Sequence, residues 1–199
     1  VDRMDPSASA IDSVNTIVND DGVLTAHNTD YSAIAQLIER DRLDPAASVL
    51  LRGSGGMAKA TAAAFRDAGF TRVTIVARNE RNGRMLADLY GFSWVAEVGD
   101  ATADILVNVT PIGMAGGAEE PTLAFSEDAI AAASVVFDVV ALPAETPLIA
   151  AARSAGTPVI TGAEVATLQA LEQFVLYTGI RPSAEQVREA EEFMRAGNA

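Results

Sequence analysis

A glycine-rich segment, Gly53-Ser54-Gly55-Gly56-Met57-Ala58, has the spacing in this sequence that most clearly points to a chemical role. It follows an apolar run that predicts a β-strand and precedes an alanine-rich stretch that predicts a helix. In that context G-x-G-x-x-G/A indicates a dinucleotide site, because the glycines allow a tight turn and a close approach to pyrophosphate. The N–H groups and positive end of the helix would then face the phosphates. The alternative is a glycine-rich turn without a ligand. The cofactor-binding residues expected here are Gly53, Ser54, Gly55, Gly56 and Met57.

An arginine stands where the next predicted strand ends, in Ala77-Arg78-Asn79. NAD-binding chains of this kind usually carry an acid there, which accepts hydrogen bonds from the ribose hydroxyls. A guanidinium cannot accept such a bond, but it pairs with a 2′-phosphate and stacks on adenine. The sequence therefore predicts NADP as the cofactor, held in part by Ala77, Arg78 and Asn79. An acid, Glu80, is nevertheless close by, and a solvated surface charge is the alternative for Arg78.

The composition excludes several other classes of protein. With no cysteine and one histidine, His27, the chain can build neither a zinc–thiolate site nor a multi-histidine site, so we expect no metal. A net charge of −13 disfavours nucleic acid and anionic membranes as partners. No apolar run approaches the roughly 18 residues of a membrane span. We expect a cytoplasmic protein with a small-molecule substrate, and an exposed imidazole on His27.

Short apolar runs alternate with alanine-rich helical stretches from about residue 48 onward. This alternation is typical of repeated βα units around a parallel sheet, so the expected fold class is α/β, a Rossmann-type doubly wound sheet. The expected strands are Val49–Arg52, Val73–Ala77, Ile105–Asn108, Val135–Val139 and Pro158–Thr161, with Phe92–Val95 as a further candidate. The expected helices between them are Met57–Ala68, Glu80–Tyr90 and Thr146–Ala155.

Other patterns flank this block. The runs Ser13–Val18 and Val23–Ala26 surround Asn19-Asp20-Asp21-Gly22, which predicts a hairpin closed by an Asp-Gly turn. A helix is expected over 30–40, and two more over 163–178 and 183–196.

Seven short strings occur in order along nearly the whole chain. They are Ser13-Val14-Asn15-Thr16, Asn28-Thr29-Asp30, Gly53–Gly56, Asn108–Met114, Asp138-Val139-Val140, Pro143 with Thr146-Pro147-Leu148, and Gly162 followed by Leu168-Gln169-Ala170. Together they resemble the shikimate dehydrogenases, and most closely the divergent shikimate dehydrogenase-like branch. The resemblance implies a two-domain, NADP-dependent oxidoreductase that interconverts 3-dehydroshikimate and shikimate or a related cyclic hydroxy acid.

The resemblance also assigns roles to single residues. It makes Asn15, Thr16, Asp30 and Gln169 substrate-binding, with Asp30 as the acid of a catalytic lysine–aspartate pair. It places Asn108, Thr110, Gly113, Val139 and Gly162 at the nicotinamide end of the cofactor. Each substrate residue also has a structural alternative: Asp30 as a helix N-cap, Asn15 as a strand-end residue and Gln169 as a polar group on a packed helix.

The resemblance further implies a division of the chain. Residues 1–40 would be the C-terminal remnant of a substrate-binding domain, 41–161 the nucleotide-binding domain, and 162–199 helices that return to the substrate domain. Because the sequence opens without methionine, we expect it to be part of a longer polypeptide. Faces meant for an absent domain would favour partner burial or a homodimer.

Two departures from the family pattern bear on activity. The family's catalytic lysine has no counterpart upstream of Ser13, and Lys59, the only lysine, lies in the phosphate-loop helix. Ala141 stands where the biosynthetic enzymes usually have a tyrosine that reaches the substrate. We therefore expect weak activity. The alternatives are a non-catalytic module that binds NADP or a metabolite, and a quinate-type dehydrogenase.

Overall fold

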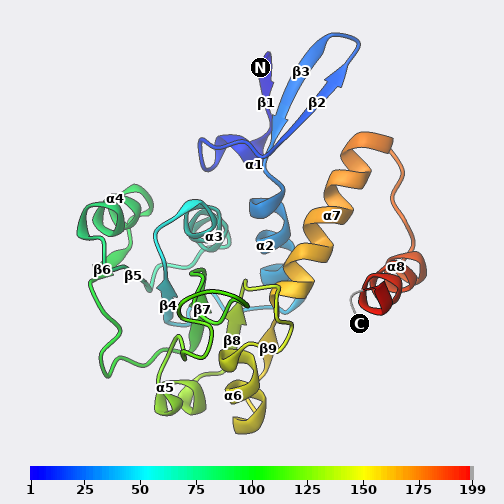
Figure 1. Cartoon of the computed structure of the whole chain (residues 1–199). Helices are drawn as coiled ribbons and strands as arrows, with labels where there is room; N and C mark the ends of the chain where they lie inside the picture. Colours follow the sequence, from blue (N-terminus) through cyan, green and yellow to red (C-terminus); the bar gives the residue numbers. More distant parts are fainter. Residues whose placement is uncertain (198–199) are drawn as a thin grey trace.

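Two β-sheets joined by helices make up the computed structural model, which describes residues 1–197 (Figure 1). The larger sheet is parallel, with the strand order β6-β5-β4-β7-β8-β9. Its strands in that order are Ser93–Val95, Val73–Val76, Val49–Arg52, Ile105–Asn108, Val135–Asp138 and Val159–Ile160. Within this sheet the chain forms the central strand β4 first and proceeds outward through β5 to β6. It then crosses to the other side of β4 and forms β7, β8 and β9. This is the doubly wound Rossmann order, which confirms the predicted fold class.

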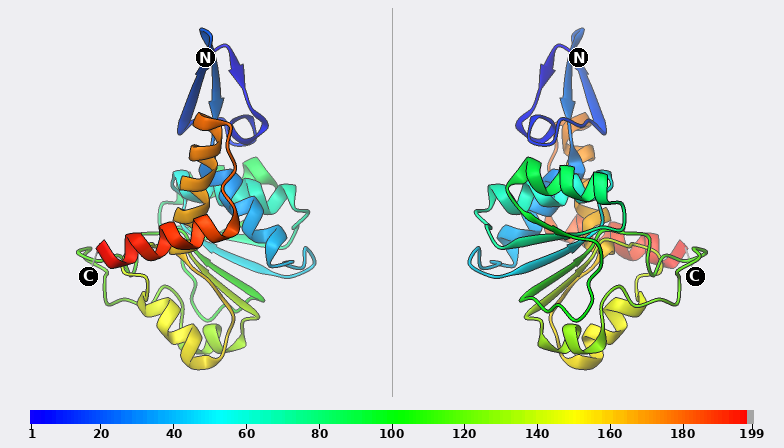
Figure 2. Two further views of the ribbon diagram at one scale, coloured as in Figure 1. Left: turned by 90° about the vertical axis from the view of Figure 1, so that its right-hand side faces the viewer. Right: turned by 90° about the vertical axis from the view of Figure 1, so that its left-hand side faces the viewer.

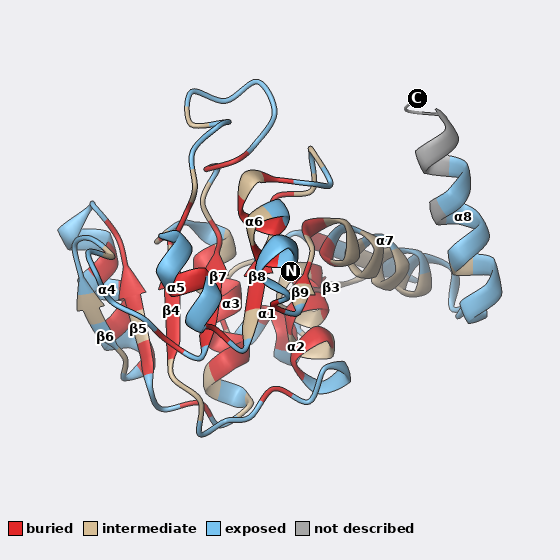
Figure 3. Cartoon of the chain, turned by 90° about the horizontal axis from the view of Figure 1, so that it is seen from below, coloured by how far each residue is buried: buried red, intermediate tan, exposed pale blue. Residues whose placement is uncertain are grey.

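Helices cover both faces of this sheet. One face is covered by α2 (Thr29–Arg40), α3 (Gly56–Asp67) and α4 (Glu80–Tyr90), and the other by α5 (Glu127–Ala132) and α6 (Pro147–Ala155). The central strands are buried on both sides, and every residue of β7 is buried (Figure 3). Near-continuous apolar runs are what a strand covered on both faces requires.

The smaller sheet stands away from the larger one (Figures 1 and 2). It consists of β1 (Arg3–Met4), β3 (Val23–His27) and β2 (Thr16–Asp20), in that order. β2 and β3 form the predicted hairpin, with Asp21 at φ +48° and Gly22 at φ +90° in a two-residue turn. Positive φ at both turn positions matches the twist of the strands, which explains the Asp-Gly sequence.

The last two helices leave the larger sheet. α7 (Gly162–Thr178) runs beside α2 toward the small sheet, and α8 (Ala184–Gly197) turns back from it (Figure 1). A capping box starts α7: Thr161 Oγ1 accepts from the Glu164 backbone N–H, and the Glu164 carboxylate accepts from the Thr161 N–H over 2.8 Å. This cap fixes the direction in which α7 begins, and α7 then packs along α2.

Several element boundaries differ from the sequence expectation. β5 and β8 end one residue early, so Ala77 and Val139 lie just beyond their strands, and β9 keeps only two of the four expected residues. The sequence analysis missed β1, α1 (Pro6–Ser9) and α5, because these elements of two to six residues have neither a continuous apolar run nor enough turns to show a helical periodicity. The imidazole of His27 is not exposed as expected, since its side chain is only 16% exposed, 3.7 Å from the Asp5 carboxylate. Within residues 1–197, no helix has the length and apolar character to cross a membrane.

Candidate functional site

The glycine loop joins the end of β4 to the start of α3. Gly53 has φ +134°, and a Cβ on it would lie 2.7 Å from Cγ2 of Val109 and 3.1 Å from the Val109 carbonyl oxygen. Both the backbone conformation and the contact with the segment after β7 therefore require glycine. The first glycine of the motif makes the turn and also lets two loops approach at the carboxyl edge of the sheet.

The other two glycines face open space. A Cβ on Gly55 or Gly56 would meet no atom within 4 Å. Gly55 is the N-cap of α3 and provides no side chain to bind the first N–H groups of the helix. Ala58 is fully buried, as expected for the close packing of the helix. An uncapped helix start beside open space can accept the phosphate groups of a dinucleotide.

The segment after β5 presents Arg78 to solvent. Its side chain is 80% exposed and its Nη2 lies 3.6 Å from Oε2 of Glu119. Asn79 caps α4, since its Oδ1 accepts from the Asn82 backbone N–H over 3.0 Å. The Ala77 carbonyl accepts from Nε1 of Trp94 over 3.1 Å. Of the three residues, Arg78 alone has a charged side chain that can bind an anion, and only Oδ1 of Asn79 is used in the cap.

A buried polar network joins the segments after β7 and β8. Asn108 is fully buried, and its amide donates to the Ile112 carbonyl and to Oδ1 of Asp138, while its Oδ1 accepts from Thr110 Oγ1 over 2.6 Å. Asp138 also accepts from Thr146 Oγ1 over 2.6 Å and from the Val140 N–H. Burial raises the pKa of Asp138, and these hydrogen bonds partly offset the shift. Because its amide is used within the protein, Asn108 shapes this edge of the sheet by holding the loops in place.

Two glycines let these loops pack closely. Gly113 has φ +88°, and a Cβ there would lie 3.3 Å from Cβ of Thr146. At Gly162, the first residue of α7, a Cβ would lie 2.2 Å from the Val140 carbonyl oxygen. The start of α7 therefore rests directly on the backbone after β8. Val139, also in this segment, is half-buried against the core.

The predicted substrate residues meet where α2, α7 and the small sheet come together. Gln169 of α7 donates from Nε2 to Oδ1 of Asp30 on α2 over 2.7 Å. Asp30 is half-buried, and this burial raises its pKa while the nearby Asn15 amide lowers it. The N-cap of α2 is Asn28, whose Oδ1 accepts from the Tyr31 N–H. The capping alternative for Asp30 is therefore wrong, and its carboxylate instead contacts α7.

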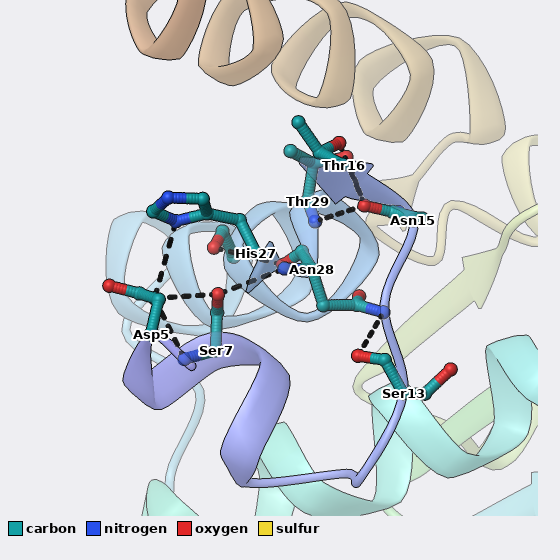
Figure 4. Close-up of polar contacts among 9 residues, drawn as sticks. Asp5, Ser7, Ser13, Asn15, Thr16, His27, Asn28 and Thr29 are labelled. Carbon is teal, nitrogen blue, oxygen red and sulfur yellow. Dashed lines mark hydrogen bonds and ion pairs between the residues drawn. The ribbon is translucent and has the colours of Figure 1, made fainter. Parts of the chain in front are cut away.

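Asn15 and Thr16 lie beside this pair, at the start of β2. Oδ1 of Asn15 accepts from the Thr29 N–H and from Thr16 Oγ1, each over 2.9 Å (Figure 4). The alternative role of Asn15, to stabilise the end of a strand, therefore holds for its Oδ1. Gln173, one turn beyond Gln169, donates to Thr29 Oγ1 over 3.3 Å. The sequence analysis missed Gln173, although its i, i+4 spacing from Gln169 places both amides on one face of α7.

A chain of hydrogen bonds fixes the start of α2. Ser7 Oγ donates to Asp5 and accepts from the Asn28 N–H over 3.0 Å, and the Asn28 amide donates to the Ser13 carbonyl (Figure 4). His27 lies beside Asp5 at the same point. These contacts hold the N-cap of α2, and Asp30 follows two residues later.

Two further observations limit the chemistry of the site. Within residues 1–197, no group of three or more histidine, aspartate or glutamate side chains could hold a metal ion. Lys59 lines a cavity with Ser54, Gly55 and Gly56 at the glycine loop, and no described cation forms an ion pair with Asp30. The chain's only lysine therefore lies beside the glycine loop.

Comparison with curated proteins gives clear relatives, although no protein-family model matches the chain. A shikimate dehydrogenase-like protein of Haemophilus influenzae is 55% identical over 195 residues, which are 98% of this chain and 72% of the relative. A shikimate dehydrogenase (NADP(+)) of Oleidesulfovibrio alaskensis is 36% identical over 182 residues, which are 90% of this chain and 65% of the relative. The chain thus spans about two thirds of the length of these relatives.

Comparison with solved structures also gives proteins that are described as shikimate or quinate dehydrogenases or as similar to them. A shikimate 5-dehydrogenase-like protein superposes with a TM-score of 0.95 at 55% identity, covering 98% of this chain and 72% of that one. The shikimate 5-dehydrogenase of Thermus thermophilus in complex with NADP(H) and shikimate gives 0.81 at 28% identity, with 96% and 72% covered. The quinate dehydrogenase of Corynebacterium glutamicum in complex with NAD gives 0.82 at 31% identity, with 95% and 71% covered.

The strand order and the glycine loop between β4 and α3 define a Rossmann-type α/β protein. Within that class, the predicted resemblance is confirmed by the 55% identity across 98% of the chain. The chain belongs to the shikimate dehydrogenase family.

Proposed function

We propose that this chain carries the cofactor site and part of the substrate site of an NADP-dependent oxidoreductase that acts on shikimate or a related cyclic hydroxy acid. The observation that carries the proposal is the 2.7 Å contact between Asp30 and Gln169, because it joins two predicted substrate residues from distant parts of the chain. Residues 1–40 and 162–199 then serve the substrate, and residues 41–161 serve the nucleotide.

The residues present fit an NADP molecule. Open space at Gly55 and Gly56 beside the uncapped start of α3 suits the pyrophosphate. Arg78, at the end of β5, provides the cation for a 2′-phosphate. The polar network of Asn108, Thr110 and Asp138 holds the loops that would border the nicotinamide. When bound, the cofactor supplies or accepts hydride.

On the substrate side, Asp30 accepts a hydrogen bond from a ring hydroxyl while Gln169 orients its carboxylate. The NH₂ group of Asn15 and the amide of Gln169, which both lie beside the Asp30 carboxylate, provide further contacts for hydroxyl groups. Asp30 is half-buried, so a hydrogen bond to its carboxylate is less screened than one at the surface. The lysine that the family resemblance pairs with Asp30 is not among these 199 residues, since Lys59 lies at the glycine loop.

The second candidate function is a non-catalytic module that binds NADP or a metabolite. One observation favours it: Ala141 places a methyl group where, by the family resemblance, a tyrosine would reach the substrate. A quinate-type specificity is the third candidate, because the quinate dehydrogenase of C. glutamicum has the same fold. Substrate oxidation separates the first and third candidates from the second.

Trp94 offers a direct test of nucleotide binding. It is the only tryptophan, it donates to the carbonyl of Ala77, and the guanidinium of Arg84 lies 4.3 Å from its ring centre. We expect NADP to change its emission at concentrations well below those required for NAD. Arg78→Gln should weaken NADP binding about tenfold or more and leave NAD within about twofold. Arg181→Gln, which removes an exposed arginine paired with Glu172, is the matched control.

Catalysis is then tested by adding shikimate or quinate with NADP and recording the absorbance of the reduced nicotinamide. Slow, Asp30-dependent reduction with shikimate supports the oxidoreductase. Reduction with quinate in preference to shikimate supports the third candidate. Because the lysine that the family resemblance pairs with Asp30 is not among these 199 residues, the same assay is made on a protein that also carries that lysine. NADP binding without reduction by that protein supports the non-catalytic module, and a protein that binds neither nucleotide contradicts all three.

A further inference from the structure

Two arginines and two glutamates line a cavity of about 510 Å³ at the carboxyl edge of the larger sheet. One of the glutamates, Glu97, follows β6 and, among the described residues, forms an ion pair with neither arginine. Arg52 is the last residue of β4, Arg78 follows β5, and Glu119 belongs to the segment between β7 and α5. Ser54 of the glycine loop and Asn79 line the same cavity. The glycine loop and the predicted 2′-phosphate residue therefore share one space with a second arginine and two acids.

The pair between Arg78 and Glu119 is loose. Its closest atoms are 3.6 Å apart, and the side chains are 80% and 40% exposed. Exposed pairs of this kind contribute little and exchange readily with solvent or another anion. The main chain of Glu119 is fixed, because its carbonyl accepts from the N–H groups of Gly113 and Thr122 over 3.0 and 3.1 Å. Its carboxylate can therefore leave Arg78 without a change in the loop.

Arg52 is in the opposite situation. It is half-buried and donates from Nη1 to the carbonyl of Ala124. Among the described residues, no carboxylate lies within 4.0 Å of its guanidinium. Burial lowers the pKa of Arg52, Glu119 partly offsets this shift, and Arg78 adds to it. A half-buried guanidinium with one carbonyl partner has most of its five N–H donors available for an anion.

Charge and geometry together favour a dianion in this cavity. Of the two carboxylates in the lining, only Glu119 lies within 4.0 Å of a guanidinium, that of Arg78, so among the described residues Arg52 has no carboxylate partner. A phosphate monoester carries a charge of about −1.5 to −2 near pH 7. Arginine binds phosphate with two parallel N–H donors, so each arginine can hold a different phosphate oxygen. Glu119 forms an ion pair with Arg78, whereas among the described residues neither glutamate lies at ion-pair distance from Arg52, so a phosphate can fill that place.

We propose that Arg52 is a second phosphate-binding residue of the nucleotide site, acting with Arg78 on the 2′-phosphate, and that Glu119 is an internal anion which this phosphate displaces. This inference rests on the proposed NADP site and deepens it. It makes the preference for a phosphorylated ribose depend on a strand residue outside the predicted Ala77–Asn79 segment. It also makes Glu119 a competitor that limits phosphate affinity.

The test uses two probes that differ only in the 2′-phosphate, adenosine 2′,5′-bisphosphate and adenosine 5′-monophosphate. Calorimetric titration of the unaltered chain should show tighter binding of the bisphosphate. Arg52→Gln should reduce bisphosphate affinity about tenfold or more and change monophosphate affinity less than about twofold. Arg52→Lys, which keeps the charge but not the two parallel donors, should restore part of the loss. Thermal unfolding of both variants shows whether each is folded.

Glu119 has the opposite expected effect. Glu119→Gln should tighten bisphosphate binding by about twofold to fivefold, as expected for loss of an exposed competing carboxylate, and leave the monophosphate unchanged. The matched controls are Arg181→Gln and Glu172→Gln, which each remove one charge from an exposed pair at α7, outside this cavity. Neither control should change the ratio of the two affinities.

The outcomes separate the inference from the function on which it rests. If the unaltered chain prefers the bisphosphate but Arg52→Gln leaves the ratio unchanged, the NADP site stands and the role of Arg52 is overturned. A loss for both probes alike assigns Arg52 to general folding or pyrophosphate binding and also overturns it. If Glu119→Gln weakens monophosphate binding, Glu119 is a ribose ligand, and the competitor role is wrong. If neither probe binds, the proposed function fails as well.

Discussion

Asp30 and Gln169 share a hydrogen bond of 2.7 Å although 139 residues separate them in the chain. The contact joins α2, which leads away from the small sheet, to α7, which starts at the edge of the large sheet. The start of α7 in turn rests on the backbone after β8 through Gly162. The proposed substrate residues are therefore linked, through α7, to the loops that border the proposed cofactor site.

Asp30→Asn should weaken shikimate binding, measured by calorimetry with NADP present. The carboxylate accepts hydrogen bonds more strongly than an amide, and a charged bond of this kind contributes about 1.5–3 kcal/mol, or roughly tenfold or more in affinity. Gln169→Leu should weaken binding too. Since the two side chains touch, the double variant should lose less than the sum of the single losses.

Glu39→Gln, at an exposed position on α2, is the control for a lost acid on the same helix. Equal shikimate affinity in Asp30→Asn and the unaltered chain would show that the pair is only structural.

Asp138→Asn should destabilise the protein by about 1–3 kcal/mol, because its NH₂ group would face hydrogen-bond donors in a fully buried site. The variant should also change the pH dependence of stability. Burial raises the pKa of Asp138 above its ordinary value of 3.8. A raised carboxyl pKa contributes stability below the ordinary pKa, and this contribution is lost as pH rises through the folded-state pKa.

The free energy of unfolding should therefore be compared between the unaltered chain and Asp138→Asn at several pH values upward from 3.8. We expect the difference to shrink as pH rises, because only the unaltered chain loses the contribution. A difference that grows with pH would contradict the raised pKa.

Gly162→Ala should destabilise the fold and move α7, which carries the predicted substrate residue Gln169, away from the proposed cofactor site. The added Cβ would lie 2.2 Å from the Val140 carbonyl oxygen, so α7 must move, at a cost of about 1–3 kcal/mol. Because α7 carries Gln169, shikimate affinity should fall more than NADP affinity. Ala166→Gly, at an exposed position of α7, costs about 1 kcal/mol through helix propensity alone. It should leave both affinities unchanged, and if it reproduced the shikimate loss, the displacement argument would be wrong.

Ala141→Tyr should strengthen shikimate binding by several-fold. Ala141 is half-buried in the segment after β8, where the resemblance places a phenol that reaches the substrate. A tyrosine hydroxyl there adds one hydrogen bond, worth about 0.5–1.5 kcal/mol. Leu142→Tyr adds the same ring at the neighbouring exposed position and should have no effect. Equal affinities in both variants and the unaltered chain would refute the explanation of weak activity through Ala141.

Much of the fold could be predicted from the sequence because its signals are local. The strands Val49–Arg52 and Ile105–Asn108 were predicted to the residue, since buried parallel strands appear as continuous apolar runs. Gly22 and the glycine loop marked their turns because these turns require positive φ or an absent side chain. Local signals failed for β1, whose two residues are paired with Thr25 and Ala26 of a distant strand.

The sequence by itself determined the order of βα units, the glycine loop with Arg78 after it, and the identity of most candidate site residues. Tertiary structure decided which of them touch. It alone brought Asp30 to Gln169, closed the network of Asp138 with Asn108 and Thr146, and placed Arg52 and Glu119 beside Arg78. The physical reason is that backbone conformation follows from neighbouring residues, whereas contacts between side chains from distant segments depend on how whole elements pack.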